Sequence, residues 1–223
     1  DFRLFQNKLG VDITYYDKIT SNDILFASIS QTSGFGSQVV NIGELRNTGI
    51  ELLLNITPIK RTDFSWDMTF NFANNQNEVV SLLTPEQDEE SIRVSESRTR
   101  SAYIHHEEGQ PYSVIKGFKY ARDAAGNIQY DENGYPVRGE FGVLGNGVHP
   151  TTLGLTNRFR YKNFQLSVLV DGKFGGDIYA ATNAFAYLRG LHKNTLVGRT
   201  DGNVGGSKTL PLDEVDNYYS RIY

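Results

Sequence analysis

Two neighbouring stretches, GIELLLNITPI at residues 49–59 and FSWDMTFNF at residues 64–72, alternate apolar and polar side chains with few interruptions. Because successive side chains of a strand point to opposite faces, each stretch predicts a strand with one apolar and one polar face. The short segment 60–63 between them predicts a tight turn, so the two strands are expected to form an antiparallel hairpin. Each run is about ten residues long, the length with which a tilted strand crosses the hydrocarbon core of a bilayer. A hairpin considered alone is nevertheless more typical of a soluble sheet with its apolar face on an ordinary core.

The rest of the chain contains three further stretches with the same period of two. Together they predict five strands, at about residues 8–19, 48–60, 64–77, 151–161 and 164–175, which leaves long loops at 20–47, 78–150 and 176–223. The connections therefore alternate between long and short. Outer-membrane barrels have this arrangement, because their periplasmic turns are tight and their extracellular loops are extended. We expect the turns at 60–63 and 161–163 to face the periplasm and the three long loops to face the outside of the cell.

Five strands cannot close a barrel, since the smallest bacterial barrels have about eight and an open edge in lipid leaves main-chain polar groups unpaired. The predicted fold class is therefore all-β: a section of a large antiparallel transmembrane β-barrel with long extracellular loops, in contact with outer-membrane lipid. Within the longest loop, residues 84–101 are charged and serine-rich, which is typical of a mobile segment.

Composition narrows the classes of protein to which the chain can belong. The mean hydropathy is −0.42 and no long apolar run is present, which excludes a helical membrane protein. The net charge of −4 offers no basic surplus, so no nucleic-acid partner is expected. The chain has no Cys and therefore forms neither a disulfide nor a thiolate metal site.

The polar faces of the predicted strands carry six charged residues that we expect to point into the barrel lumen. They are Asp12, Glu51, Asp67, Arg158, Arg160 and Asp171. These side chains are candidates for pairing with a plug or for lining a hydrated path, and simple solvation of a polar lumen explains them equally well. Leu53 and Leu169 interrupt the polar faces, and Asn157 interrupts an apolar one.

Few residues suggest catalysis or metal binding. His105 and His106 are adjacent, so on a strand they point to opposite faces and do not chelate one ion. The stretches that begin at Asp123 and Asp131 have calcium-like spacing but lack the full ligand set of an EF-hand, and both are ordinary turn signals. We expect no catalytic residue, no metal site and no cofactor.

Aromatic residues in the expected loops are the candidates for contacts with a substrate or a partner. The set is Tyr103, Tyr112, Phe118, Tyr120 and Tyr187. Their rings are suited to stacking on a sugar or a peptide, and packing between loops explains them just as well.

Five phrases, spread in order over most of the chain, resemble the SusC/RagA family of TonB-linked outer-membrane transporters. They lie at residues 39–51, 64–79, 108–112, 145–150 and 161–179. The resemblance implies import of oligosaccharides or peptides across the outer membrane of a Gram-negative bacterium. It also implies energy supplied by the TonB complex, a SusD-like surface lipoprotein as partner, and a barrel section without the plug and the closing strands.

Two other interpretations stay open. One is a TonB-dependent receptor barrel for siderophore- or cobalamin-type ligands. The other is a soluble β-rich glycan-binding module, which would remain monomeric without detergent.

Overall fold

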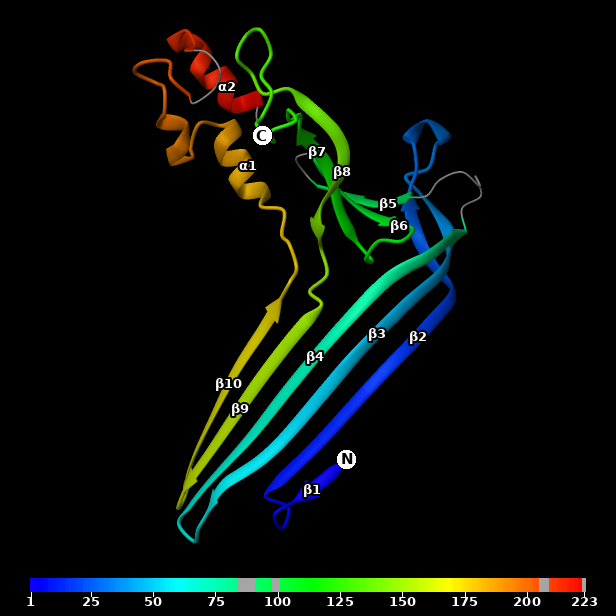
Figure 1. Ribbon diagram of the computed structural model, residues 1–223, viewed down its shortest axis with the longest axis vertical. Helices are drawn as coiled ribbons and strands as arrows, with labels where there is room; N and C mark the ends of the chain where they lie inside the picture. The colour runs from blue at the N-terminus through cyan, green and yellow to red at the C-terminus, as the bar shows by residue number, and fades with distance from the viewer. Residues whose placement is uncertain (84–90, 98–100, 205–208, 222–223) are drawn as a thin grey trace. The chain divides into compact units, whose positions relative to one another are not determined.

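The computed structural model describes residues 1–83, 91–97, 101–204 and 209–221 (Figure 1). The chain divides into two compact units, each built from segments that are distant in the sequence. The first unit contains residues 1–92, 106–113 and 146–177, and the second contains residues 93–105, 114–145 and 178–223.

The first unit is built on a six-stranded antiparallel sheet with the order β1-β2-β3-β4-β9-β10. The strands are β1 (Phe2–Leu4), β2 (Leu9–Ser28), β3 (Ser37–Lys60), β4 (Phe64–Leu83), β9 (Thr151–Tyr161) and β10 (Phe164–Phe174). Figure 1 shows β2, β3, β4, β9 and β10 running side by side along most of their length. Strands therefore lie at each of the five expected positions, and a short strand, β1, precedes them.

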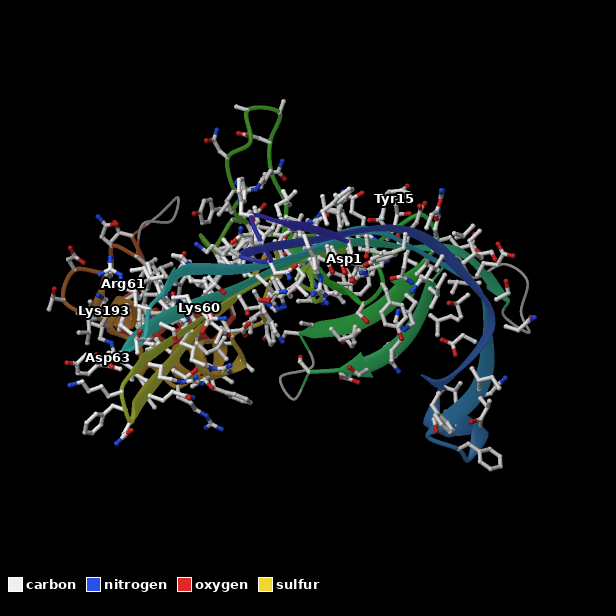
Figure 2. All side chains as sticks on the ribbon, turned by 90° about the horizontal axis from the view of Figure 1, so that it is seen from below. Asp1, Tyr15, Lys60, Arg61, Asp63 and Lys193 are labelled. Carbon is white, nitrogen blue, oxygen red and sulfur yellow. The ribbon has the colours of Figure 1, made fainter. Side chains whose placement is uncertain are left out.

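Two tight turns close this sheet at one end. The N–H of Arg61 donates to the carbonyl of Phe64 at 2.8 Å, which closes the turn between β3 and β4. Lys162, with φ 50°, lies in the turn between β9 and β10, and its N–H donates to the carbonyl of Asp63 at 2.9 Å. Figure 2 shows Lys60, Arg61 and Asp63 together at the first turn. The two turns are thus joined by a main-chain hydrogen bond.

The β2–β3 hairpin extends much further than the alternation indicates. Its register continues from the pair Leu9 and Ile56 to the pair Ser28 and Ser37, so only residues 29–36 connect the strands, including a 3₁₀ turn η1 (Gln31–Ser33). The loop expected at 20–47 is therefore mostly strand. The extension escapes the pattern because both of its faces mix polar residues with apolar ones, as at 24–27 and 39–40, so no alternation marks it. Main-chain hydrogen bonds hold the strands together without one continuous apolar side.

The segment expected as one loop at 78–150 contains a second, four-stranded sheet with the order β5-β6-β7-β8. Its strands are β5 (Ser91–Glu96), β6 (Ala102–Glu107), β7 (Val114–Tyr120) and β8 (Arg138–Asn146). The beginning of the expected loop is also strand, because β4 continues to Leu83. Of the segment predicted to be mobile, 91–96 forms β5, whereas 84–90 and 98–100 lie outside the described residues.

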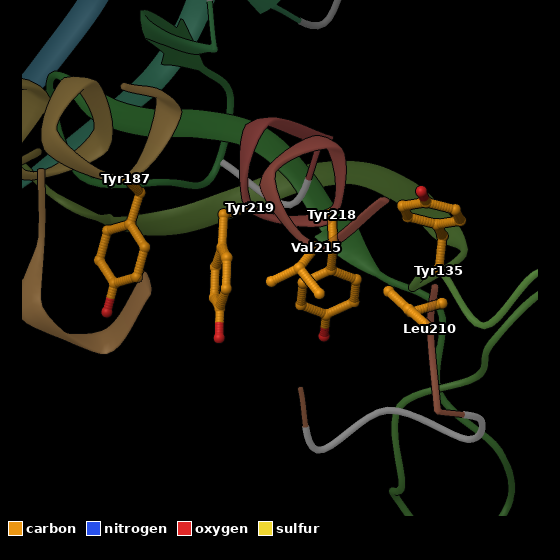
Figure 3. Packing of buried hydrophobic residues seen from close by; sticks show 6 residues of the cluster. All are labelled: Tyr135, Tyr187, Leu210, Val215, Tyr218 and Tyr219. Carbon is orange, nitrogen blue, oxygen red and sulfur yellow. The ribbon is translucent and has the colours of Figure 1, made fainter. Parts of the chain in front are cut away.

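The last expected loop, 176–223, contains helical segments that pack around tyrosines. These are α1 (Ala181–Leu188), η2 (Lys193–Leu196), η3 (Leu212–Glu214) and α2 (Val215–Arg221). Their core consists of Tyr135, Tyr187, Leu210, Val215, Tyr218 and Tyr219, all less than 9% exposed (Figure 3). Burial of the phenol raises the pKa of Tyr218 to about 12. None of the helices among the described residues is long and apolar enough to cross a membrane.

Candidate functional site

One face of the six-stranded sheet is apolar from strand to strand. The register aligns Leu54 of β3 with Val11 of β2 on one side and with Phe70 of β4 on the other. Phe70 in turn lies opposite Leu155 of β9, and Leu155 lies opposite Val170 of β10. A single row across five strands therefore contains only apolar side chains.

The apolar side chains of this face are half-buried on the central strands and exposed on the outer strands β2 and β10. Ile13, Leu166 and Val170 are 56%, 60% and 61% exposed. Along β4 the apolar positions run from Phe64 to Phe72, which at ~3.3 Å per residue corresponds to about 26 Å of strand. A tilt of roughly 40° reduces this length to about 20 Å of height, within the ~25 Å apolar band of outer-membrane barrels. We call this face the apolar band.

Asn157 is the polar side chain inside the apolar band, and it has a partner. The indole N–H of Trp66 donates to Asn157 Oδ1 at 3.1 Å. The Trp66 ring also stacks on Phe159, with ring centroids 5.6 Å apart and planes at 21°. The interruption noted in the sequence is thus a satisfied hydrogen bond between neighbouring strands, next to the closed end of the sheet.

The opposite face carries the six charged residues that the sequence analysis singled out. The register places Asp12, Glu51, Asp67, Arg158, Arg160 and Asp171 all on the side away from Leu54. Asp67 lies directly opposite Arg158 and accepts a hydrogen bond from the Thr57 hydroxyl at 2.9 Å. Among the described residues, no ion pair involves any of the six. Their assignment to a lumen remains a prediction.

The apolar band ends where the β2–β3 hairpin continues beyond it. On the face of the apolar band, the pair that follows Tyr15 and Ile50 is Asp17 and Thr48. Arg46 donates two hydrogen bonds to the Asp17 carboxylate, at 2.9 and 2.6 Å, and Thr48 donates a third at 3.2 Å. A partly exposed, hydrogen-bonded ion pair of this kind suits the watery side of a membrane boundary rather than hydrocarbon.

The pair next to Asp17 and Thr48 shows why residue 49 is a glycine. On the polar face, Tyr16 lies opposite Gly49. A Cβ on Gly49 would lie 2.5 Å from the Tyr16 hydroxyl oxygen and 2.6 Å from the carbonyl oxygen of Asn74. The absence of a side chain therefore leaves the space that the tyrosine ring occupies.

Beyond the band, the segment Gly109–Tyr112 is hydrogen-bonded to the far part of β4. The N–H of Val79 donates to the Gln110 carbonyl at 3.0 Å, and the N–H of Gly109 donates to the Val79 carbonyl at 2.8 Å. The N–H of Tyr112 donates to Asn77 Oδ1 at 2.6 Å. This arrangement brings together two phrases of the sequence, Asn74–Val79 and Glu108–Tyr112, as one piece of structure.

A second pair of phrases meets in the same way. The N–H of Asn146 donates to the Asp177 carboxylate at 2.9 Å, and the N–H of Asp177 donates to the Asn146 carbonyl at 2.7 Å. The sequence analysis used both segments only for the family resemblance and did not predict this contact. An Asn and an Asp at element ends are nevertheless typical partners for free main-chain N–H groups.

A polar groove of about 620 Å³ lies between β4 and these phrases. Its lining includes Arg46, Thr48, Asn74, Gln76, Gln110 and Asn146. Amide side chains offer both donors and acceptors, so the groove is chemically suited to hydroxyl groups and to water.

The five candidate aromatic residues separate into two groups. Tyr187 is 7% exposed within the tyrosine core, and Tyr112 stacks on the buried His106 with centroids 3.9 Å apart, so both serve packing. Tyr103, Phe118 and Tyr120 instead lie on β6 and β7 of the second sheet. A role of these aromatic residues in ligand contact remains a prediction.

The histidines and the calcium-like turns have structural roles. His106 accepts a hydrogen bond at Nδ1 from the Ser113 N–H at 3.2 Å, while His105 contacts Phe141. The Asp123 carboxylate accepts from the side chain and N–H of Asn127 and from the Ala125 N–H, and these bonds lower its pKa. No group of three metal-ligating side chains occurs in the described part of the chain.

Comparisons with known proteins agree with this geometry. The chain is 30% identical over 201 residues to TonB-dependent receptor P3 of Formosa agariphila, which covers 80% of the chain and 20% of that receptor. It is 26% identical over 221 residues to TonB-dependent receptor SusC of Bacteroides thetaiotaomicron, covering 90% of the chain and 21% of SusC. The chain belongs to the SusC/RagA-type TonB-dependent receptors. It spans about a fifth of the length of the curated relatives it matches.

A solved structure shows the same fold. The RagAB peptide transporter matches 77% of this SusC/RagA-type chain and 20% of its own chain, with a TM-score of 0.58 and 21% identity. The predicted fold class, a section of a large antiparallel barrel, is therefore confirmed. No protein-family model matches the chain.

Proposed function

We propose that this chain forms wall strands and outer segments of a TonB-dependent transporter in the outer membrane of a Gram-negative bacterium. The transporter imports oligosaccharides or peptides, draws energy from the TonB complex through its plug region, and works with a SusD-like surface lipoprotein. Support comes from the relatives, which are named as TonB-dependent receptors and include SusC, and from the fold of the RagAB peptide transporter.

The observation that carries this proposal is the two-faced sheet. The apolar band faces lipid, and the six charged residues on the other face point into the lumen, where they meet the plug or a hydrated path. A soluble module would hold the same band against water. At about 25 cal/mol per Å², exposure of a few hundred Å² of apolar surface costs several kcal/mol, which disfavours the soluble glycan-binding alternative.

No catalytic role is part of the proposal, because the relatives bear the names of receptors and transporters. Tyr103, Phe118 and Tyr120 are the described aromatic residues that we assign to contacts with a substrate or with the lipoprotein. The names of the relatives favour nutrient import over a siderophore- or cobalamin-type receptor.

Uptake in the native bacterium tests the proposal. Cells that lack the receptor containing this chain should lose accumulation of one class of labelled oligosaccharide or peptide, and loss of TonB should give the same defect. A tagged receptor should also co-purify with a surface lipoprotein. Uptake that persists without TonB, or a receptor whose loss affects only iron or cobalamin acquisition, would contradict it.

A further inference from the structure

The second sheet presents three aromatic rings on one face. Tyr103 of β6 lies opposite Lys116 of β7, and Phe118 follows two residues later on the same side of β7. Phe141 of β8 contacts both rings edge to face, with centroids 5.8 Å from Tyr103 and 5.0 Å from Phe118. Phe118 and Phe141 are 44% and 38% exposed, so the rings form an accessible platform.

Three cations lie against these rings. The guanidinium carbon of Arg138 is 3.2 Å from the Phe118 centroid, and that of Arg93 is 5.7 Å from the Tyr103 centroid. The ammonium of Lys116 is 5.6 Å from the Phe141 centroid. We call the six residues Arg93, Tyr103, Lys116, Phe118, Arg138 and Phe141 the aromatic–basic face.

Arg138 has the geometry of an anion-binding group. A guanidinium presents its N–H donors as a planar fork, and this fork matches a carboxylate or a sulfate. Among the residues that the structure describes, no hydrogen bond or ion pair involves Arg138. Its contact with Phe118 therefore orients the charge without neutralising it.

Two acidic groups of the described residues, Glu96 and Glu140, form ion pairs on the strands of this sheet. Glu96 approaches Arg93 only to 4.0 Å, and both side chains are more than a third exposed, where an ion pair contributes little. Glu140 pairs at 3.9 Å with Lys119, the residue after Phe118, which points to the other side of β7. The aromatic–basic face thus contains three cations among its six residues, although the whole chain carries a net charge of −4.

We infer that the aromatic–basic face binds an anionic saccharide, one whose pyranose rings carry carboxylate or sulfate groups. The aromatic rings pack against the apolar C–H faces of the sugar, and Arg138 binds the acidic substituent, with Lys116 and Arg93 adding positive charge. Arg clusters also recognise acidic peptides, so an acidic peptide is the competing ligand that the test below includes. The inference names a substrate class and therefore rests on the proposed transport function.

Calorimetric titration of the purified full-length receptor in detergent, with hexagalacturonate as probe, tests this inference. The fully methyl-esterified hexamer is the matched neutral ligand. We expect R138Q to weaken hexagalacturonate binding about tenfold or more, because a charge-assisted bidentate contact is lost. F118L should weaken it by a smaller factor, and K119Q, which removes the same charge from the other side of the strand, should leave it unchanged.

Equal affinities for the acid and the ester, equal effects of R138Q and K119Q, or equally tight binding of hexaglutamate would overturn the inference. R138Q and K119Q receptors must show the same heat-modifiable mobility as the wild type, which separates loss of binding from loss of folding. The proposed transport function is tested separately, by uptake. A receptor that imports a neutral glycan or peptide with TonB but does not bind hexagalacturonate would support the transport function and contradict only the anionic-saccharide assignment.

Discussion

Arginine at position 54 should damage the receptor far more than arginine at position 55. Leu54 lies in the apolar row between Val11 and Phe70, with Ile56 and Ile59 following towards the turn and Leu52 and Ile50 preceding it on the other side. Leu54 is therefore near the middle of the apolar band. An Arg at the midplane of the lipid face costs about 2–4 kcal/mol.

Asn55 offers a matched control from the neighbouring residue. Its side chain points to the polar face and accepts a hydrogen bond from the Thr69 hydroxyl at 3.0 Å. Asn55→Arg loses that bond, worth about 0.5–1.5 kcal/mol, and places the new charge among polar groups. The cost of Leu54→Arg should thus exceed that of Asn55→Arg by at least about 0.5 kcal/mol, and Leu54→Met should cost little because its volume is conserved.

Urea titration of the full-length receptor, folded into lipid vesicles and scored by gel mobility, measures these differences. Equal free-energy losses at the two positions, or a larger loss at Asn55, would refute the assignment of faces. A large loss for Leu54→Met would indicate a tightly packed core there instead of lipid.

Three further outcomes are expected from other parts of the chain. Trp66→Phe leaves the Asn157 carbonyl without its donor in the apolar band, which should lower the free energy of unfolding by about 1–3 kcal/mol, and Asn157→Leu in the same background should restore much of it. Because burial raises the pKa of Tyr218 to about 12, while an unfolded tyrosine titrates near ~10, its stabilising effect is present below pH ~10 and lost as the pH rises towards 12; near-ultraviolet circular dichroism of the tyrosine core and phenolate absorbance should change together over that range. A cysteine replacing Asn127 should react with an impermeant thiol reagent on whole cells and one replacing Arg61 only after lysis, whereas the reverse pattern would invert the orientation.

The sequence predicted the strands of the six-stranded sheet because a strand with one face in lipid, as we propose here, has a regular pattern. Every second residue from Ile50 to Ile56 must be apolar, and the other residues need not be, so the alternation indicates both the strand and its faces. The same rule placed Asp12 and Arg160, which are distant in the sequence, on one face of the sheet.

Outside the bilayer that rule no longer applies. The strand extensions at 20–28 and 37–47 have polar residues on both faces, and the short strands β5 to β8 pair through segments that show no long alternation. The burial of Tyr187 depends on contacts with α2, far along the chain, which a local pattern does not contain. The sequence analysis did not find the partner of Asn157. Trp66 lies on the neighbouring strand β4, two residues from the Met68 that faces Asn157, and the register of β4 and β9 could not be predicted.

Spin-label accessibility along β3 distinguishes a lipid-facing apolar band from a buried or water-facing one. Single cysteines at positions 50 to 59, introduced into a full-length receptor without other cysteines and reconstituted in bilayers, would carry the nitroxide. We expect high access to dissolved oxygen at positions 50, 52, 54 and 56 and low access at 51, 53 and 55. The β3–β4 register shifts between Ile56 and Ile59, so the alternation should shift by one residue there and position 59 should again have high access. Uniform access along the strand, or an oxygen maximum at positions 51, 53 and 55, would contradict it.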